Sequence, residues 1–194
     1  MRFKLISLAP VLIFWSVISA QDTIQFSKKC SISSGLGYAN AVDASKGGTS
    51  FFIQMDYQFS SQFSLAIESE HMNFDVPGYY PDSIIDNNVQ HFYDHYFSLL
   101  IKYHLPLNSK FHASLASGWT YLIRQTDYYD VYTEPTSQLI THRMSSFNTY
   151  GIPFLLETSY PVWKNLSAGI RVKYNFNPGY GDTYSAGIGI SLKL

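Results

Sequence analysis

The last thirty residues of the chain alternate apolar and polar side chains, and this pattern limits what the chain can fold into. Apolar residues occupy every second position in residues 166–176 and again in residues 184–194. The segment between these two runs contains Pro178, Gly179 and Gly181. Strict period-two alternation on both sides of a turn-forming segment is typical of an antiparallel β-hairpin.

The two predicted strands are long for a soluble protein. Each spans eleven residues, whereas strands of globular proteins usually contain about five or six. A tilted strand needs about nine to eleven residues to cross a bilayer. Arg171 and Lys173 stand in mid-strand on the polar face, but the apolar face is unbroken. The hairpin therefore predicts lipid on one side of the sheet and a closed, polar interior on the other.

The same alternation recurs in six earlier segments, which brings the predicted strands to eight. The six segments are residues 30–39, 51–59, 63–70, 97–105, 110–124 and 150–160. Short turns follow the second, fourth and sixth strands, whereas longer loops follow the first, third and fifth, the longest at residues 125–144. An even strand number with short turns at one end is a feature of outer-membrane barrels. We expect an all-β, eight-stranded antiparallel up-and-down transmembrane β-barrel.

The N-terminus has the features of a secretory signal peptide. Arg2 and Lys4 precede an apolar run from Leu5 to Ile18, and Ala20 offers a small residue for cleavage. The apolar run, about fourteen residues, is too short to span a bilayer as a helix. We expect residues 1–20 to be the signal peptide and residues 21–194 to form one outer-membrane β-barrel domain.

Composition excludes other classes of protein. A net charge of −1 gives no electrostatic reason to expect nucleic-acid binding. A mean hydropathy of −0.06 excludes a bundle of membrane helices. The single cysteine, Cys30, excludes an internal disulfide framework.

The polar faces of the predicted strands carry four acids and four bases, which we call the lumen charge network. Side chains just fill the interior of an eight-stranded barrel, and buried charges are tolerated when they are paired. A neutral set favours a structural network that plugs the lumen over an ion path or a catalytic cluster. We expect Arg171 to contact Glu157 or Glu68. The members are Asp56, Glu68, Glu70, Lys102, Arg124, Glu157, Arg171 and Lys173.

Aromatic residues gather near both ends of the predicted strands. Tyr57, Phe63 and Tyr160 stand near the short turns, whereas Trp119 and Tyr150 stand nearer the long loops. Because amphipathic rings favour the headgroup level of a bilayer, the pattern predicts two aromatic girdles.

Two pairs of residues have the spacing of a site. His112 and Ser114 show the His-x-Ser spacing of outer-membrane lipid A deacylases, but alternation places both inside the barrel, near the short turns. His91 and His95 would lie about 13 Å apart on a strand, too far to share a metal ion. No nucleophile with a base and an orienting third group is apparent. We therefore expect no catalytic residues, no cofactor and no metal.

The whole pattern resembles the OmpA/OmpX-like family of small eight-stranded outer-membrane β-barrels of Gram-negative bacteria. The resemblance covers residues 28–194 and includes the alternating hydrophobics of the last strand, although Leu194 stands where that family has an aromatic residue. It implies an exported monomer in the outer membrane that contacts lipid and lipopolysaccharide. It also implies help from the barrel assembly machinery during biogenesis.

The predicted function is a non-enzymatic membrane anchor for surface loops that mediate interaction or adhesion. An outer-membrane lipid-modifying enzyme stays open as an alternative. It would require a polar catalytic group on the outer face near the long loops, where His71, His91 and His95 are candidates. A secreted lipocalin-like binder of small ligands is a second alternative, but that fold buries its apolar residues and exposes its charges.

The signal peptide gives the first testable prediction. We expect the mature protein to lack residues 1–20 and to begin at Gln21, because Ala20 offers the cleavage site. N-terminal sequencing of the purified protein checks this. A sequence that begins at Met1 would count against export.

Overall fold

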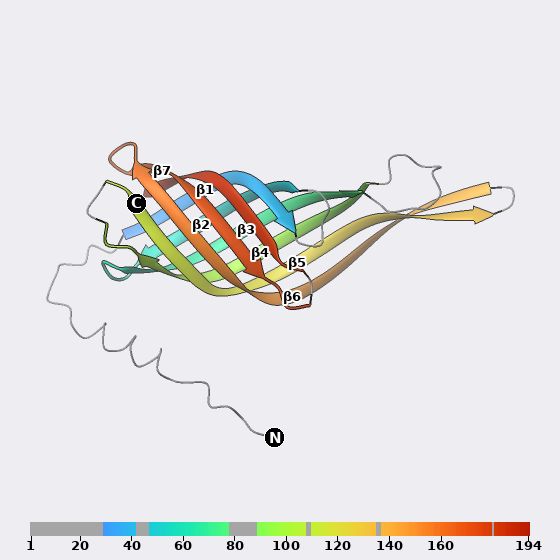
Figure 1. The fold of residues 1–194 in the computed structure, drawn as a ribbon, viewed down its shortest axis with the longest axis horizontal. Coiled ribbons are helices and arrows are strands. Elements are labelled where there is room, and N and C mark those ends of the chain that lie inside the picture. Colours follow the sequence, from blue (N-terminus) through green and yellow to red (C-terminus); the bar gives the residue numbers. More distant parts are fainter. Residues whose placement is uncertain (1–28, 42–46, 78–88, 108–109, 135–136, 180) are drawn as a thin grey trace, which may run out of the picture.

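Eight antiparallel strands close into a barrel in the computed structural model, as Figure 1 shows. The structure describes residues 29–41, 47–77, 89–107, 110–134, 137–179 and 181–194. The signal peptide predicted at residues 1–20 lies outside the described residues. The expected fold class is confirmed. The strands are β1 (Lys29–Ala41), β2 (Gly48–Gln58), β3 (Phe63–Pro77), β4 (Val89–His104), β5 (His112–Glu134), β6 (Ser137–Pro161), β7 (Leu166–Phe176) and β8 (Thr183–Lys193).

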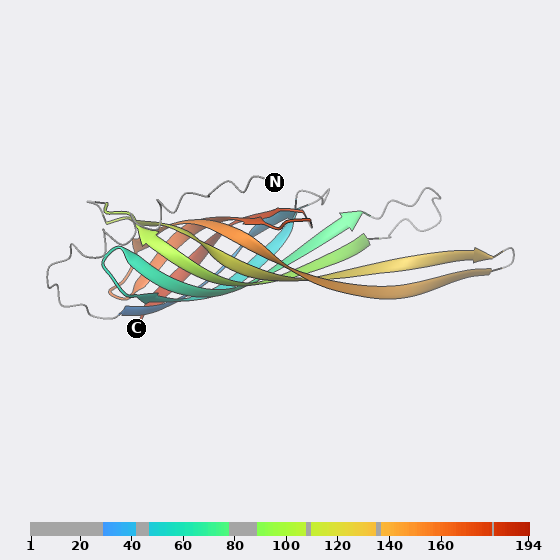
Figure 2. The ribbon, with the colours of Figure 1, turned by 90° about the horizontal axis from the view of Figure 1, so that it is seen from below.

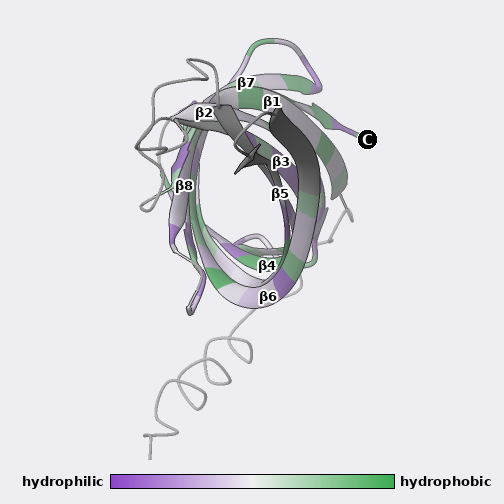
Figure 3. Ribbon diagram, turned by 90° about the vertical axis from the view of Figure 1, so that its right-hand side faces the viewer, coloured by the Kyte–Doolittle hydropathy of each residue, from purple (hydrophilic) through white to green (hydrophobic). Residues whose placement is uncertain are grey.

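Each strand pairs with its neighbours in sequence, and β1 closes the sheet by pairing with β8 from Ser31↔Lys193 to Ala41↔Thr183. Closure removes the two free edges of the sheet, whose backbone N–H and C=O groups would find no partners in hydrocarbon. Figure 3 views the strands along the barrel as a closed ring. No helix in the described part of the chain is long and apolar enough to cross a membrane.

The prediction of a long loop at residues 125–144 is wrong. β5 and β6 continue as a paired ladder to Glu134↔Ser137, and the resulting hairpin projects well beyond the other strands (Figures 1 and 2). β4 pairs with β5 only as far as His91↔Asp127, so the hairpin extends without a neighbour on that side. Away from lipid neither face of a hairpin has to be apolar. The projecting parts of β5 and β6 therefore show no alternation of apolar and polar residues in the sequence.

The predicted third and fourth strands are too short. β3 runs on to Pro77 and β4 begins at Val89, whereas the sequence pattern ended the third strand at residue 70 and began the fourth at residue 97. The extensions add Asp94 and Tyr96 to the interior and His95 to the outer face.

The outer face of the barrel is apolar across its middle. Ile170 and Ile188 are 60% and 69% exposed, as expected for side chains that face lipid. On β3 and β4 this apolar band ends at Ile67 and Phe97. The outward side chains described beyond it are Ser69, His71 and Asn73 on β3 and His95 and Tyr93 on β4. Aromatic contacts lie at both edges, as the predicted girdles require. They are Phe63–Tyr103, Phe111–Tyr160, Trp119–Tyr150 and Tyr121–Tyr150.

Glycines line the seam where β1 pairs with β8. Gly35 pairs with Gly189 across this seam, and the ring of Phe52 packs against both. A Cβ atom added at Gly35 would lie 2.6 Å from Phe52 Cε1, and one added at Gly189 would lie 2.8 Å from Phe52 Cζ. The glycines therefore make room for an aromatic ring in the lumen, and this ring supports Arg171, described below.

The assignment of alternate β7 side chains to lipid and to the lumen can be tested by substitution. Replacing Ile170 by Arg places a charge among lipid chains near the middle of the bilayer, which should destabilise the protein by about 2–4 kcal/mol. Urea unfolding in lipid vesicles measures this change in the free energy of unfolding. Asn165→Arg, in the exposed turn before β7, is the matched control and should have little effect. An Ile170→Arg variant as stable as the wild type would show that the facing is wrong.

Candidate functional site: the lumen charge network

The inward side chains form three groups of ion pairs along the lumen. The group nearest the long loops joins Arg124 to Asp94 through two bonds, Nε to Oδ1 at 2.6 Å and Nη2 to Oδ2 at 2.7 Å. Asp94 is completely buried. Bidentate geometry of this kind is the strongest form of carboxylate recognition by arginine.

The middle group crosses the barrel from β3 to β7. Lys173 Nζ lies 2.5 Å from Glu68 Oε1 and 2.9 Å from Glu70 Oε2. Glu70 Oε1 also accepts a hydrogen bond of 2.8 Å from Ser185. Arg171 Nη2 lies 2.8 Å from Glu68 Oε2, and its guanidinium stands 3.8 Å from the centre of the Phe52 ring. Two acids and two bases thus compensate one another inside the protein.

The middle group is sealed from water. Lys173, Tyr96 and Asn175 have no exposed surface. Tyr96 contributes a hydroxyl that lies 2.7 Å from Thr183 Oγ1 and accepts a hydrogen bond of 3.1 Å from Asn177 Nδ2. Water therefore reaches none of these three side chains.

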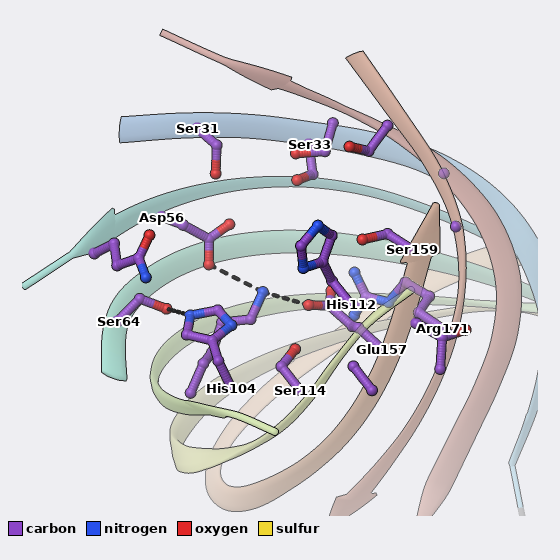
Figure 4. A pocket seen from close by; sticks show the side chains of 18 of the residues that line it. Ser31, Ser33, Asp56, Ser64, His104, His112, Ser114, Glu157, Ser159 and Arg171 are labelled. Atoms are coloured by element: carbon purple, nitrogen blue, oxygen red, sulfur yellow. Dashed lines mark hydrogen bonds and ion pairs between the residues drawn. The ribbon is translucent and has the colours of Figure 1, made fainter. Parts of the chain in front are cut away.

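The group nearest the short turns holds Lys102 between two acids. Its Nζ lies 3.0 Å from Asp56 Oδ1 and contacts Glu157 Oε2 on the other side. Lys102 is 5% exposed, and it lines a cavity of about 550 Å³ that occupies this end of the lumen. Figure 4 shows the side chains that line this cavity.

Serine and histidine residues supply much of the cavity lining. Ser64 Oγ lies 2.9 Å from His104 Nε2, and His112 and Ser114 line the same cavity (Figure 4). Among the described residues no hydrogen bond joins His104 to a carboxylate, so this Ser–His pair lacks the third group that orients a catalytic base.

All eight residues proposed from the sequence point into the lumen, but the structure divides them among the three groups. Sequence reasoning missed Asp94, the partner of Arg124. The alternation of β4 continues inward from Lys102 through Ser98 and Tyr96 to Asp94, so extending the fourth strand would have found it.

The register of β6 and β7 differs from the expected one. Glu157 was expected opposite residue 167 or 169, but it pairs directly with Arg171. The difference arises because β6 runs to Pro161, which pairs with Ser167, and only residues 162–165 form the turn. Of the two partners expected for Arg171, Glu68 makes the contact, while Glu157 turns to Lys102.

A separate polar group lies on the outer face, beyond the apolar band. His71 and His95 pair across β3 and β4, and their Nδ1 atoms lie 3.3 Å apart. Partial burial and the neighbouring His95 lower the pKa of His71 from its ordinary value. The backbone of His91 pairs with that of Asp75, but the side chain of His91 lies outside the described part of the structure.

A closed eight-stranded sheet with an apolar exterior and a charged interior defines a transmembrane β-barrel. No protein-family model matches the sequence, and no curated protein matches it. Solved structures do match. A major outer membrane protein from Thermus thermophilus has a TM-score of 0.60 at 14% identity, covering 87% of this chain and 100% of that one.

Two further matches come from other bacteria. OprG from Pseudomonas aeruginosa has a TM-score of 0.58 at 13% identity, covering 87% of this chain and 96% of that one. Ail, the attachment invasion locus protein of Yersinia pestis, was solved in complex with the heparin analogue sucrose octasulfate. It has a TM-score of 0.57 at 10% identity, covering 87% of this chain and 100% of that one. The chain therefore has the fold of the small outer-membrane β-barrels, as the sequence resemblance predicts.

The middle group of charges gives the next prediction. Arg171→Met leaves Glu68 with Lys173 as its remaining partner. The free energy of unfolding should therefore fall by no more than about 3–5 kcal/mol, the usual cost of breaking a buried ion pair. Adding Glu68→Gln should recover part of this loss, with a coupling free energy of at least about 1 kcal/mol in a double-mutant cycle. Urea unfolding of the four proteins supplies the cycle. Strictly additive effects would show that the two side chains do not interact.

Proposed function

We propose that this protein is an integral outer-membrane β-barrel with a plugged lumen, which anchors a projecting hairpin at the cell surface for interaction or adhesion. The observation that carries the proposal is the sealed middle group, in which Lys173 is buried between Glu68 and Glu70. An ion entering this layer would have to break paired charges in a place that water does not reach. We further propose that the protein acts without enzymatic chemistry.

The surface element of the proposal is the hairpin of β5 and β6. It extends past the rim of the barrel (Figure 2), at the end opposite the short turns, where outer-membrane barrels carry their extracellular loops. Ail, a barrel of the same fold, is described as an attachment protein and was solved with a heparin analogue. This likeness supports an interaction role for the long-loop end, but it does not identify the ligand.

The proposed setting is the outer membrane of a Gram-negative bacterium, reached by way of the signal peptide. The apolar band would contact lipid and lipopolysaccharide, and insertion would use the barrel assembly machinery. We propose a monomer, because the closed sheet leaves no strand edge within the barrel wall for a second chain.

The two alternative functions fit less well. A lipocalin-like binder would bury its apolar side chains, whereas Ile170 and Ile188 stand exposed on the outside and Lys173 is buried inside. A lipid-modifying enzyme would need a nucleophile beside the His71–His95 pair. Among the described residues no hydroxyl or thiol makes a hydrogen bond to either ring, which favours the non-enzymatic proposal.

Single-channel recording tests the plug. The purified barrel in a planar lipid bilayer should show no conductance steps, because the middle group blocks the lumen. A variant carrying Glu68→Ala, Glu70→Ala, Arg171→Ala and Lys173→Ala removes this group without changing the net charge and should conduct. Heat-modifiable migration on a gel verifies that both proteins are folded. Conductance by the wild type would contradict the plug, and a silent variant would mean that the middle group is not the barrier.

A further inference from the structure

Two histidines face each other on the outside of the barrel, where the apolar band ends. His71 on β3 and His95 on β4 are direct partners in the ladder. Directly opposed residues of antiparallel strands hold their Cβ atoms about 4.5–5.5 Å apart. The two ring centres are 4.4 Å apart with an angle of 40° between the planes. The closed sheet thus fixes the pair without help from a loop.

The nitrogen positions match those of two ligands on one metal ion. The Nδ1 atoms lie 3.3 Å apart. Two nitrogens bound to a tetrahedral zinc ion at about 2.0–2.1 Å from the metal are separated by about 3.3–3.4 Å. A metal ion could therefore be held by both rings with little movement of either nitrogen. In its absence, one ring must donate its Nδ1 proton to the other for the contact to be a hydrogen bond.

The chemistry of the ligands limits the choice of metal. Imidazole nitrogen suits Zn²⁺, Cu²⁺ and Ni²⁺, whereas Ca²⁺ and Mg²⁺ prefer oxygen. The described residues contain no cluster of three or more His, Cys, Asp or Glu side chains that could hold a metal, so water would complete the coordination.

The pair is accessible from outside the membrane. Both rings are partly exposed, and they stand beyond Ile67 and Phe97, the last apolar residues of the band on their strands. Tyr93 lies nearly parallel to His71, with 6.3 Å between ring centres. An ion could thus approach from the aqueous side of the headgroup layer without crossing hydrocarbon.

We propose that His71 and His95 form a surface site for one divalent transition-metal ion, Zn²⁺ or Cu²⁺, at the long-loop edge of the apolar band. The site is independent of the lumen charge network and of the proposed plug. The sequence alone excluded His95 as a metal ligand, because the only partner considered for it was His91, four residues away on the same strand. The true neighbour is on the next strand, and it appears only when β3 and β4 extend past the ends predicted for them.

Zinc titration tests the site. The full chain, produced without a histidine tag and folded in detergent micelles, should bind one Zn²⁺ in isothermal titration calorimetry. His71→Gln and His95→Gln should each weaken binding by at least about tenfold, because each removes one of the two imidazole ligands. His112→Gln, an exposed histidine at the opposite end of the barrel, is the matched control and should leave the affinity unchanged.

Electron paramagnetic resonance of bound Cu²⁺ gives a second measurement. The wild type should show coupling to two imidazole nitrogens, and each single variant should show coupling to one. Heat-modifiable migration of every variant verifies folding, which separates loss of the site from loss of the barrel. The proposal is overturned if no ion binds the wild type, if the two variants bind within twofold of it, or if His112→Gln is the change that removes binding.

Discussion

The lack of hydrogen-bonding partners in hydrocarbon is the constraint on which the structure depends. An open sheet would leave two strand edges unpaired, at a cost of several kcal/mol for each unsatisfied group. Pairing of β1 with β8 removes both edges. Once the sheet is closed, alternate residues must face lipid or the lumen, so the distribution of charge follows directly. Charged residues can stand on a strand within the bilayer only if they point inward and find partners there.

The lumen meets this requirement by combining large side chains with small residues on the neighbouring strands. Gly35 and Gly189 leave room for Phe52, and Phe52 carries the guanidinium of Arg171 on its face. Arg171 and Lys173 then reach across the barrel to Glu68. The glycines of the seam thus serve the charge network indirectly, because a side chain at either would displace the ring that supports Arg171.

The sequence was most informative where lipid imposes a pattern. β7 was predicted with its observed bounds, and β8 to within one residue at each end, because an apolar residue is required at every outward position of a strand within the bilayer. Prediction failed beyond the bilayer, where this requirement ends. The part of β5 up to residue 124 was predicted as a strand, but its continuation to Glu134 was predicted as a loop. The remaining signal was the abundance of tyrosine and threonine there, which favours strands only weakly.

The same limit explains the errors at the candidate site. All eight predicted charges point inward, because side chains alternate between the two faces along the whole of each strand. Asp94 was missed because it lies beyond the predicted start of its strand. The ion-pair partners of these charges were harder to predict than the side of the sheet on which each charge lies. Glu157 and Arg171 are adjacent on neighbouring strands, and Glu157 nevertheless contacts Lys102. The choice depends on side-chain reach across the narrow lumen, which a linear sequence does not contain.

The ladder that joins β5 to β6 has a consequence for recognition. A coil of the same length would sample many conformations and lose most of them when it bound a partner. A ribbon with backbone hydrogen bonds up to Glu134↔Ser137 has already lost that entropy during folding. Association therefore costs less ordering free energy, and more of the contact energy appears as affinity. If the hairpin binds a partner as proposed, its paired strands also set the direction from which that partner approaches the membrane.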